Sequence, residues 1–427
     1  MLPLATINGV AIDPTNPTPR KYRPDGARRP SGSWTHERQQ PTGIRDDSGS
    51  RLDRETMPRT VLITGGAGFI GSHLADDLLA AGHRVRVLDR LSPQVHPDGE
   101  RPGYLDPEVE LITGDVRDAD AVRRALGGVD AVYHLAAMVG VGQSMYQVVD
   151  YTGVNDLGTA VLLEQLAARP VESLIVASSM SVYGEGLYRT AQGRLVPGTE
   201  RGRDQLAKAD WELRDADGQA LAPVATPETK QPSLASIYAL GKYVQERQAL
   251  LIGAAYGIPT VALRFFNVYG PRQALSNPYT GVLAIFAARL LNGKPPMIFE
   301  DGRQMRDFVH VKDVARACRL AMERPAAAGE VLNVGSGQAI GIRALGERLA
   351  GVMGCAEIAP EVTQRYRVGD IRHCFADIGK ARAVLGFAPK VALEDGLEEL
   401  ADWLSGQIAV DRVDQASREL AARGLTV

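Results

Sequence analysis

The sequence predicts an α/β protein built on a doubly wound parallel sheet, and three observations favour this fold class. Short β-rich runs alternate with helical stretches from residue 59 to about residue 270, which is the order of elements that builds a parallel sheet. The first run leads through a glycine-rich segment into a helical stretch. The composition, with 44% hydrophobic and 23% charged residues, is that of an ordinary globular protein.

The elements of this first part follow one another in regular alternation. In the first predicted helix, Leu74, Leu78 and Leu79 share one face, as expected of a helix that packs on a sheet. The predicted strands are Thr60–Thr64, Arg84–Leu88, Val109–Thr113, Ala131–Leu135, Leu174–Ser178 and Thr260–Leu263. The predicted helices are Ser72–Ala81, Ala119–Leu126, Gly158–Ala168 and Ile237–Leu251.

Other stretches depart from this rhythm and set the expected domain limits. Residues 1–57 are rich in proline, glycine, serine, aspartate and arginine, which predicts a disordered extension. The main domain is expected over 58–270, interrupted by a polar insertion at 185–235 that is a candidate lid. Residues 271–405 are expected to form mainly a smaller C-terminal α/β lobe that binds substrate, and 406–427 a tail. The elements predicted in the lobe are a helix at Val282–Leu291 and strands at Met297–Phe299 and Val331–Val334.

Composition argues against several classes of function. The net charge of −3 provides no basic field for nucleic acid. Cys318, Cys355 and Cys374 are too far apart to form a disulfide framework or a zinc motif. His310 and His373 lack ligand spacing, so we expect no metal site. No apolar run approaches the roughly 18 residues of a membrane helix, and no apolar signal region begins the chain. We therefore expect a cytoplasmic protein.

A glycine-rich loop, Thr64–Gly71, joins the first strand to the first helix. Gly65 permits a tight turn, Gly68 lets backbone N–H groups approach a pyrophosphate, and Gly71 lets helix and strand pack closely. Asp89 closes the second strand, where a carboxylate accepts from ribose hydroxyls and repels a 2′-phosphate. The pattern predicts a Rossmann-type dinucleotide site that takes NAD rather than NADP.

Tyr238 and Lys242 form a Tyr-x-x-x-Lys pair on a predicted helix. Residues four apart share a helix face, and an ammonium beside a phenol lowers the pKa of the phenol. Such a pair also occurs by chance on helix surfaces. It gains weight from Ser178 and Ser179, which lie at the carboxyl end of a predicted strand, because doubly wound sheets place their sites at that edge. A hydroxyl there can hydrogen-bond a reacting oxygen.

Several motifs occur in order: Thr-Gly-Gly-x-Gly-x-x-Gly, His134-Leu-Ala-Ala137, Asn155, the serine-rich strand end, Tyr-x-x-x-Lys and Arg264-Phe-Phe-Asn-Val-Tyr-Gly-Pro271. From about Arg59 to Leu404 the chain resembles the extended short-chain dehydrogenases/reductases, specifically the NAD-dependent nucleotide-sugar epimerase/dehydratase family. The resemblance implies NAD as cofactor, a nucleotide-diphosphate sugar as substrate, and a homodimer formed through the helices ending near Ala168 and Leu251.

The resemblance also assigns roles residue by residue. The catalytic residues would be Ser179, Tyr238 and Lys242. The cofactor-binding residues would be Gly65, Gly68, Phe69, Ile70, Gly71, Asp89, Asp115, Val116, Leu135, Ala136, Ala137, Asn155, Ser178, Tyr238, Lys242 and Phe265. The substrate-binding residues would be Val141, Gln143, Ser144, Ser179, Asn267, Arg306, Arg367 and Asp370. The two arginines suit a pyrophosphate, since guanidinium groups bind phosphate oxygens in pairs.

The type of reaction depends on the two residues after Ser179. The 4,6-dehydratases of the family carry an Asp-Glu pair there, whereas Met180 and Ser181 cannot transfer the protons of an elimination. An acid/base set for decarboxylation is not identifiable either. The resemblance therefore implies a 4-epimerase, in which hydride leaves C4 and returns to the other face while NAD stays bound.

The sugar is assigned by analogy only. The runs Val139–Tyr146, Gly184–Tyr188, Gln273–Tyr279 and Asp370–His373 resemble those of the 4-epimerases that interconvert dTDP-L-rhamnose and dTDP-6-deoxy-L-talose. The insertion is also typical of that group. UDP-glucose or UDP-N-acetylglucosamine 4-epimerase activity stays open as an alternative. So does a non-catalytic NAD-binding regulator, although a regulator would not need the catalytic residues.

Overall fold

The structure is a computed structural model that describes residues 57–274, 281–367, 369–406 and 413–426. The predicted N-terminal extension lies outside the described residues, apart from Met57 at its end.

Seven strands of the described chain form one parallel sheet in the order β13-β9-β5-β4-β1-β2-β3. The strand order runs outward from the middle in both directions, so the chain reverses its course between β1 and β4. This arrangement confirms the predicted doubly wound α/β fold and creates a crevice at that point. The strands are β1 (Thr60–Thr64), β2 (Arg84–Asp89), β3 (Glu110–Thr113), β4 (Ala131–His134), β5 (Ser173–Ser179), β9 (Thr260–Phe265) and β13 (Val331–Val334).

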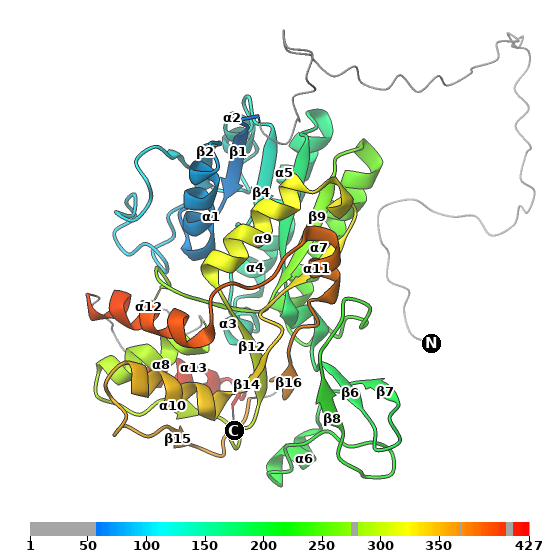
Figure 1. Ribbon diagram of the computed structural model, residues 1–427, viewed down its shortest axis with the longest axis vertical. Coiled ribbons are helices and arrows are strands. Elements are labelled where there is room, and N and C mark those ends of the chain that lie inside the picture. Colours follow the sequence, from blue (N-terminus) through cyan, green and yellow to red (C-terminus); the bar gives the residue numbers. More distant parts are fainter. Residues whose placement is uncertain (1–56, 275–280, 368, 407–412, 427) are drawn as a thin grey trace, which may run out of the picture. The chain divides into compact units, whose positions relative to one another are not determined.

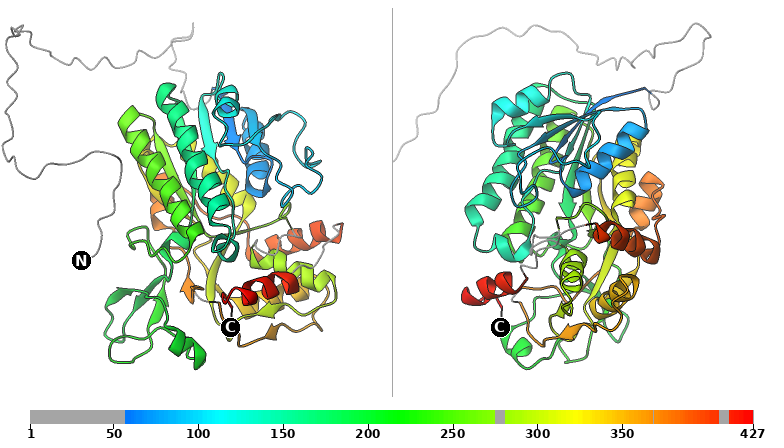
Figure 2. Two further views of the ribbon diagram at one scale, coloured as in Figure 1. Left: turned by 180° about the vertical axis from the view of Figure 1, so that it is seen from behind. Right: turned by 90° about the vertical axis from the view of Figure 1, so that its left-hand side faces the viewer.

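Helices cover both faces of this sheet (Figures 1 and 2). On one face lie α1 (Phe69–Ala80), α9 (Val311–Glu323) and α11 (Gly379–Leu385), and on the other lie α2 (Ala119–Ala125), α5 (Gly158–Ala168) and α7 (Ile237–Tyr256). Each face has its own hydrophobic core. Because successive side chains of a strand point to opposite faces, Val61 and Ile63 of β1 enter one core and Leu62 the other.

The strand predicted at Val331–Val334 is not part of the smaller lobe, so that prediction is wrong. It pairs in parallel with β9, from Val331 opposite Ala262 to Val334 opposite Phe265, and is the edge strand of the large sheet. Helix α9, which precedes it, packs against α1. The chain thus leaves the large sheet after β9, builds part of the lobe and returns, which local sequence patterns do not reveal.

The smaller lobe lies beyond the carboxyl ends of the large sheet (Figure 1). It has its own apolar core, to which Phe286, Leu345 and Leu397 contribute. Its strands are β10 (Asn267–Tyr269), β11 (Met297–Ile298), β12 (Met305–His310), β14 (Ala339–Gly341), β15 (Glu361–Val362) and β16 (His373–Cys374). Its helices are α8 (Val282–Leu291), α10 (Ile342–Val352) and α12 (Leu393–Ser405), and α13 (Val413–Ala422) follows in the predicted tail.

The insertion at 185–235 contains a small antiparallel sheet of β6 (Leu187–Arg189), β7 (Leu195–Pro197) and β8 (Ala222–Val224), with the helix α6 (Arg203–Ala207). Ion pairs fasten it to the lobe. Arg372, which is fully buried, lies 2.6 Å from the Glu212 carboxylate, and Arg201 lies 2.8 Å from that of Glu300. Because paired charges satisfy each other when buried, these contacts fix the insertion in place.

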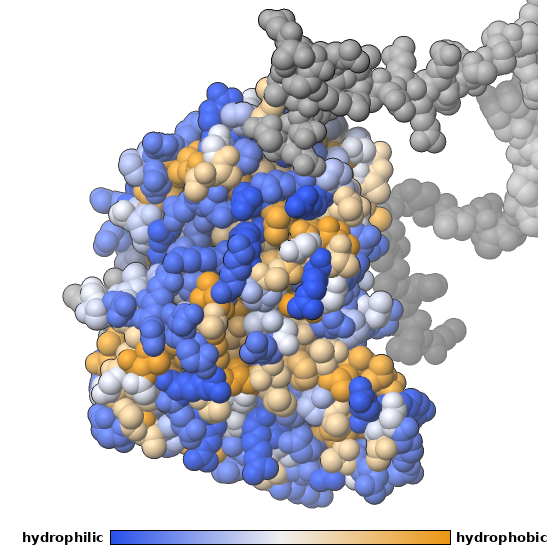
Figure 3. All heavy atoms as spheres, in the orientation of Figure 1, coloured by the Kyte–Doolittle hydropathy of each residue, from blue (hydrophilic) through white to orange (hydrophobic). Residues whose placement is uncertain are grey.

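The surface carries no broad apolar band on the face that Figure 3 presents. Hydrophilic residues spread over both parts of that face, with hydrophobic residues in smaller patches between them. None of the helices in the described part of the chain is long and apolar enough to cross a membrane.

Candidate functional site

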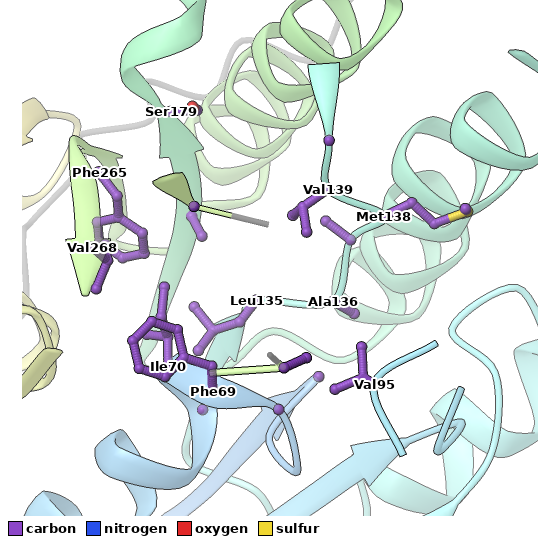
Figure 4. Close-up of a pocket in the computed structure, with 18 of the residues that line it drawn as sticks. Phe69, Ile70, Val95, Leu135, Ala136, Met138, Val139, Ser179, Phe265 and Val268 are labelled. Atoms are coloured by element: carbon purple, nitrogen blue, oxygen red, sulfur yellow. The ribbon is translucent and has the colours of Figure 1, made fainter. Parts of the chain in front are cut away.

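A cavity of about 510 Å³ opens at the carboxyl ends of the central strands, where residues of the large sheet and of the smaller lobe face each other. Its size is that of a small-molecule site. Figure 4 shows Phe265 and Val268 on one side, Met138 and Val139 on the other, and Phe69 and Ile70 at the end opposite Ser179. The cavity therefore occupies the crevice at which a doubly wound sheet binds its ligand.

The glycine loop forms one end of the cavity, and its glycines have steric reasons to be glycine. Gly65 has φ +71°, and a Cβ there would lie 2.8 Å from the backbone of Ala136. A Cβ at Gly71 would lie 2.5 Å from Gly66 Cα and 2.6 Å from the Gly65 carbonyl oxygen. The backbone cannot yield at these distances. Helix α1 begins after Gly68 without a side-chain cap, so its first N–H groups are available to an anion.

Asp89 lines the cavity at the end of β2 and is held by two backbone groups. Its carboxylate accepts from the N–H of Ala67 in the glycine loop (3.1 Å) and from that of Leu91 (2.9 Å). The neighbouring Arg90 reaches to 3.8 Å from the Asp115 carboxylate. Hydrogen bonds from Arg117 hold the pKa of Asp115 below its ordinary value. Carboxylates thus line this end of the cavity.

Ser179, Tyr238 and Lys242 line the same cavity, from the end of β5 and the first turns of α7. Burial raises the pKa of the Tyr238 phenol, and its hydrogen bond with Ser179 offsets part of that effect. Burial lowers the pKa of Lys242 to about 7, against the opposing charge of Glu246. The sequence predicts a lowered pKa for Tyr238. This prediction is wrong, because desolvation of the phenol raises its pKa more than the hydrogen bond with Ser179 lowers it.

Most of the other predicted cofactor residues also line the cavity. They are Gly65, Gly68, Phe69, Ile70, Gly71, Asp89, Asp115, Val116, Leu135, Ala136, Ala137, Ser178 and Phe265. Ser178 donates its hydroxyl to Glu246 (2.7 Å), which also pairs with Arg264 (2.6 Å). Asn155 is not among the lining residues. Its side chain clamps the backbone of Met138, accepting from the N–H (2.7 Å) and donating to the carbonyl (3.1 Å).

Two predicted substrate residues, Gln143 and Ser144, lie behind the cavity wall rather than in it. They belong to the short helix α3 (Val141–Ser144). Gln143 accepts from the Tyr151 hydroxyl (3.2 Å). Ser144 Oγ accepts the backbone N–H of Tyr238 (3.1 Å), one of the free donors at the start of α7. Ser144 therefore holds Tyr238 in place.

Of the other predicted substrate residues, Val141 and Asn267 line the cavity, whereas Arg306, Arg367 and Asp370 do not. The structure does bring these last three together, since Asp370 lies 3.9 Å from Arg306 and 4.0 Å from Arg367. The Arg306 guanidinium donates to the backbone carbonyls of Ile371 and Arg372. Arg367 lies over the Phe299 ring, 4.3 Å from its centroid. The two guanidinium groups thus have protein partners.

The cavity also includes residues that sequence reasoning missed. Gln94, Val95 and His96 come from the long loop after β2, and Phe308 from β12 in the lobe. The loop carries no periodic pattern or motif, so no local signal could have identified them. Gln245 does not line the cavity and lies on α7, three residues after Lys242, but it belongs to none of the motifs that indicate the site.

The sequence model described as the NAD dependent epimerase/dehydratase family matches residues 61–204 and 216–335, which is well over half of the chain. The chain belongs to the NAD-dependent epimerase/dehydratase family. The unmatched residues 205–215 fall inside the insertion. The match ends just after β13, so it includes the large sheet except Thr60, the first residue of β1.

Individual relatives agree with this assignment. A dTDP-L-rhamnose 4-epimerase of Burkholderia thailandensis is 36% identical over 82% of this chain and 96% of its own length. The crystal structure of a UDP-glucose 4-epimerase of Thermotoga maritima with UDP-glucose is 32% identical, with a TM-score of 0.67 over 81% of this chain and 98% of that one. A Thermus thermophilus UDP-glucose 4-epimerase in complex with NAD is 34% identical, with a TM-score of 0.64 over 82% of this chain and all of that one.

Proposed function

We propose that the protein is an NAD-dependent nucleotide-sugar 4-epimerase. One observation carries the proposal: Ser179, Tyr238 and Lys242 share a single cavity with the glycine loop and Asp89. A dinucleotide site and a proton-transfer site are therefore contiguous. A regulator that only bound NAD would not need this arrangement.

The residues around the cavity fit a bound NAD. The N-terminus of α1 and the glycine loop would hold the pyrophosphate, because the loop backbone leaves no room for side chains. Asp89 would accept from the adenosine ribose hydroxyls, and Phe265 would lie near the nicotinamide. Bound NAD supplies the hydride acceptor for oxidation at C4 and returns the hydride later.

The proton chemistry falls to the chain's own residues. Tyr238 as phenolate takes the proton of the sugar 4-hydroxyl while Ser179 hydrogen-bonds the same oxygen. The ammonium of Lys242 stabilises the phenolate. After the 4-keto sugar turns over and hydride arrives on its other face, Tyr238 gives the proton back to the oxygen. Substrate and product are then C4 epimers, and no atoms are gained or lost.

The residues after Ser179 favour epimerisation over dehydration. Met180 and Ser181 both line the cavity, and neither can act as acid or base at neutral pH. Ser181 donates its hydroxyl to Ser179 Oγ (2.9 Å) and so fixes the orientation of the catalytic hydroxyl. Elimination of water from C5 and C6 has no proton donor or acceptor at these two positions.

We infer that the sugar is dTDP-L-rhamnose, interconverted with dTDP-6-deoxy-L-talose. The 36% identical relative is named for this substrate, and residues 139–141 of the run that resembles such enzymes line the cavity. UDP-sugar epimerases are also similar, for example that of Mycolicibacterium smegmatis at 33% identity. UDP-glucose and UDP-N-acetylglucosamine are therefore the competing substrates.

The test is to incubate the purified protein with each of the three sugar nucleotides and to follow the H4 signals by NMR. A C4 epimer of dTDP-L-rhamnose is expected. Tyr238→Phe is the control, since it keeps the ring but loses the base, and the rate is expected to fall by about 10²- to 10⁴-fold. If Tyr238→Phe turned over every substrate at the wild-type rate, the catalytic assignment would be wrong.

We further infer a homodimer through α5 and α7, which pack against each other. Leu157, just before α5, is 55% exposed, and Leu251 on α7 is 59% exposed. Large apolar side chains exposed at two helices that pack together favour burial against a second copy. Light scattering of the wild-type protein is expected to give twice the monomer mass. The double variant Leu157→Glu/Leu251→Glu is expected to give the monomer mass in the same measurement.

A further inference from the structure

Lys242 ends a buried line of polar groups that runs under the cavity to the glycine loop. Its Nζ donates to Gln245 Oε1 (2.9 Å), and the amide nitrogen of Gln245 lies 2.9 Å from Thr159 Oγ1. His134 lies 2.8 Å from Thr159 Oγ1 and, at its other ring nitrogen, 2.8 Å from Thr64 Oγ1. These side chains are at most 3% exposed. A buried polar chain whose members satisfy one another is rigid.

The neighbours of Gln245 decide which end of its amide faces Lys242. Thr159 gives its one hydroxyl hydrogen to the Asn155 carbonyl and can then only accept. The Ala136 carbonyl, 3.4 Å from the amide nitrogen, can only accept as well. Both need the NH₂ group of Gln245, so the amide oxygen is turned toward Lys242. That oxygen accepts a hydrogen from the lysine and therefore favours its protonated form.

We propose that Gln245 is a positioning residue that fixes Lys242 and keeps it protonated as the partner of the Tyr238 phenolate. The proposal rests on the proposed function, because it concerns the same proton transfer. The helix supplies the geometry, since Gln245 lies three residues after Lys242 and on the same side. Thr159 and His134 act one step further away, by orienting the amide of Gln245.

The proposal predicts a distinctive dependence on pH. Tyr238 and Lys242 form a reactive pair when they share one proton as phenolate and ammonium. Without the Gln245 oxygen, that proton moves to the phenol and Lys242 becomes neutral, so the rate falls. At lower pH Tyr238 and Lys242 are both protonated, in wild type and variant alike. Lys242 is an ammonium in this state and in the reactive state, so loss of the Gln245 oxygen destabilises the two states equally. The defect should therefore vanish toward acid pH.

Other ionisable groups around Lys242 are common to wild type and variants. They are Tyr238 and Glu246 on its own helix, His134 on β4, Asp156 of the π-helical stretch Thr152–Leu157, and, through its pair with Glu246, Arg264 on β9. A change in pH dependence on substituting Gln245 alone is then due to Gln245.

The experiment compares Gln245→Met with Gln248→Met. Gln248 lies on the same helix, and its amide oxygen is buried without a hydrogen-bond partner among the described residues, so it controls for the substitution itself. The kcat of Gln245→Met is expected to fall about ten- to a hundredfold near pH 8.5, because a hydrogen bond to a charged group contributes that much, and to approach wild type only at about pH 5 and below, where Lys242 is protonated in both proteins. KM for the sugar nucleotide is expected to stay unchanged. Gln248→Met should follow wild type.

A second readout does not need turnover. In protein labelled at the lysine ε-carbon, NMR follows the titration of Lys242, assigned with Lys242→Met. Its midpoint is expected to fall by roughly one to two pH units in Gln245→Met, and by a smaller amount in Thr159→Val, which serves if Gln245→Met does not fold. An unchanged midpoint, or a loss of rate equal at all pH values, would overturn the proposal. If the Lys242 midpoint fell in Gln245→Met but the wild-type protein epimerised no sugar, the role of Gln245 would stand and the proposed function would be overturned.

Discussion

Replacing Ser144 by alanine separates two roles for this residue, substrate contact and support of Tyr238. Ser144 Oγ accepts the Tyr238 N–H at 3.1 Å and donates to the Val141 carbonyl at 2.7 Å. The side chain is fully buried. Alanine would leave the Tyr238 N–H without an acceptor in a buried site, which costs about 1–3 kcal/mol, in line with the roughly 0.5–2 kcal/mol for loss of a helix cap.

Two assays follow from this geometry. Urea unfolding of Ser144→Ala is expected to show a free energy of unfolding about 1–2 kcal/mol below wild type. In steady-state kinetics kcat is expected to fall, because the start of α7 carries the proposed base, Tyr238, while KM for the sugar nucleotide stays the same. Ser405→Ala, at a serine outside the cavity whose hydroxyl donates to the Asp402 carbonyl, is the control. A raised KM with unchanged kcat and stability would show instead that Ser144 contacts the substrate and does not support Tyr238.

Three further predictions test other parts of the structure. Gly71→Ala is expected to abolish NAD binding in calorimetry, because its Cβ would lie 2.5 Å from Gly66 Cα, whereas Gly351→Ala, on helix α10 with open space around it, should bind NAD as wild type does. Arg264→Met would leave the buried Glu246 carboxylate without its cation and is expected to lower the free energy of unfolding by about 3–5 kcal/mol; a loss below about 1 kcal/mol in urea unfolding would contradict the importance of this pair. Burial depresses the pKa of His134 from 6.5 to about 3, so its contribution to stability is complete above pH 6.5 and is lost as pH falls toward 3, with a slope of about 1.4 kcal/mol per pH unit. Unfolding of His134→Gln should therefore depend less steeply on pH than unfolding of wild type between about pH 6 and 4, and equal slopes would count against a neutral buried imidazole.

The large sheet could be predicted well because its signals are local. The buried strand predicted at Leu174–Ser178 extends from Ser173 to Ser179 in the structure, and the first helix begins at Phe69 rather than at Ser72. Buried parallel strands are continuous apolar runs, and such runs can be recognised without knowledge of their partners. The sequence predicts the edge strand β13 in the smaller lobe. This is wrong because the pairing of β13 with β9 depends on where the chain re-enters the large sheet, which no local pattern shows.

The candidate site likewise has residues that local motifs predict and residues whose roles depend on distant contacts. The glycines, Asp89, Tyr238 and Lys242 belong to short motifs, and all of them line the cavity. The sequence predicts binding roles for Ser144 and Asn155, whereas in the structure both side chains hydrogen-bond backbone groups. Their partners, Tyr238 and Met138, lie 94 and 17 positions away in the chain. Spacing within a motif cannot show contacts of that kind.

In the proposed reaction, a hydride moves away from C4 and back again on an NAD that the protein retains. The most direct measurement incubates the purified protein with dTDP-L-rhamnose in buffer without added NAD and records proton NMR spectra over time. We expect dTDP-6-deoxy-L-talose to appear until the two epimers reach equilibrium, with no net change in absorbance at 340 nm. A product that has lost water, or conversion that consumes added NAD in proportion to product, would contradict the proposed reaction.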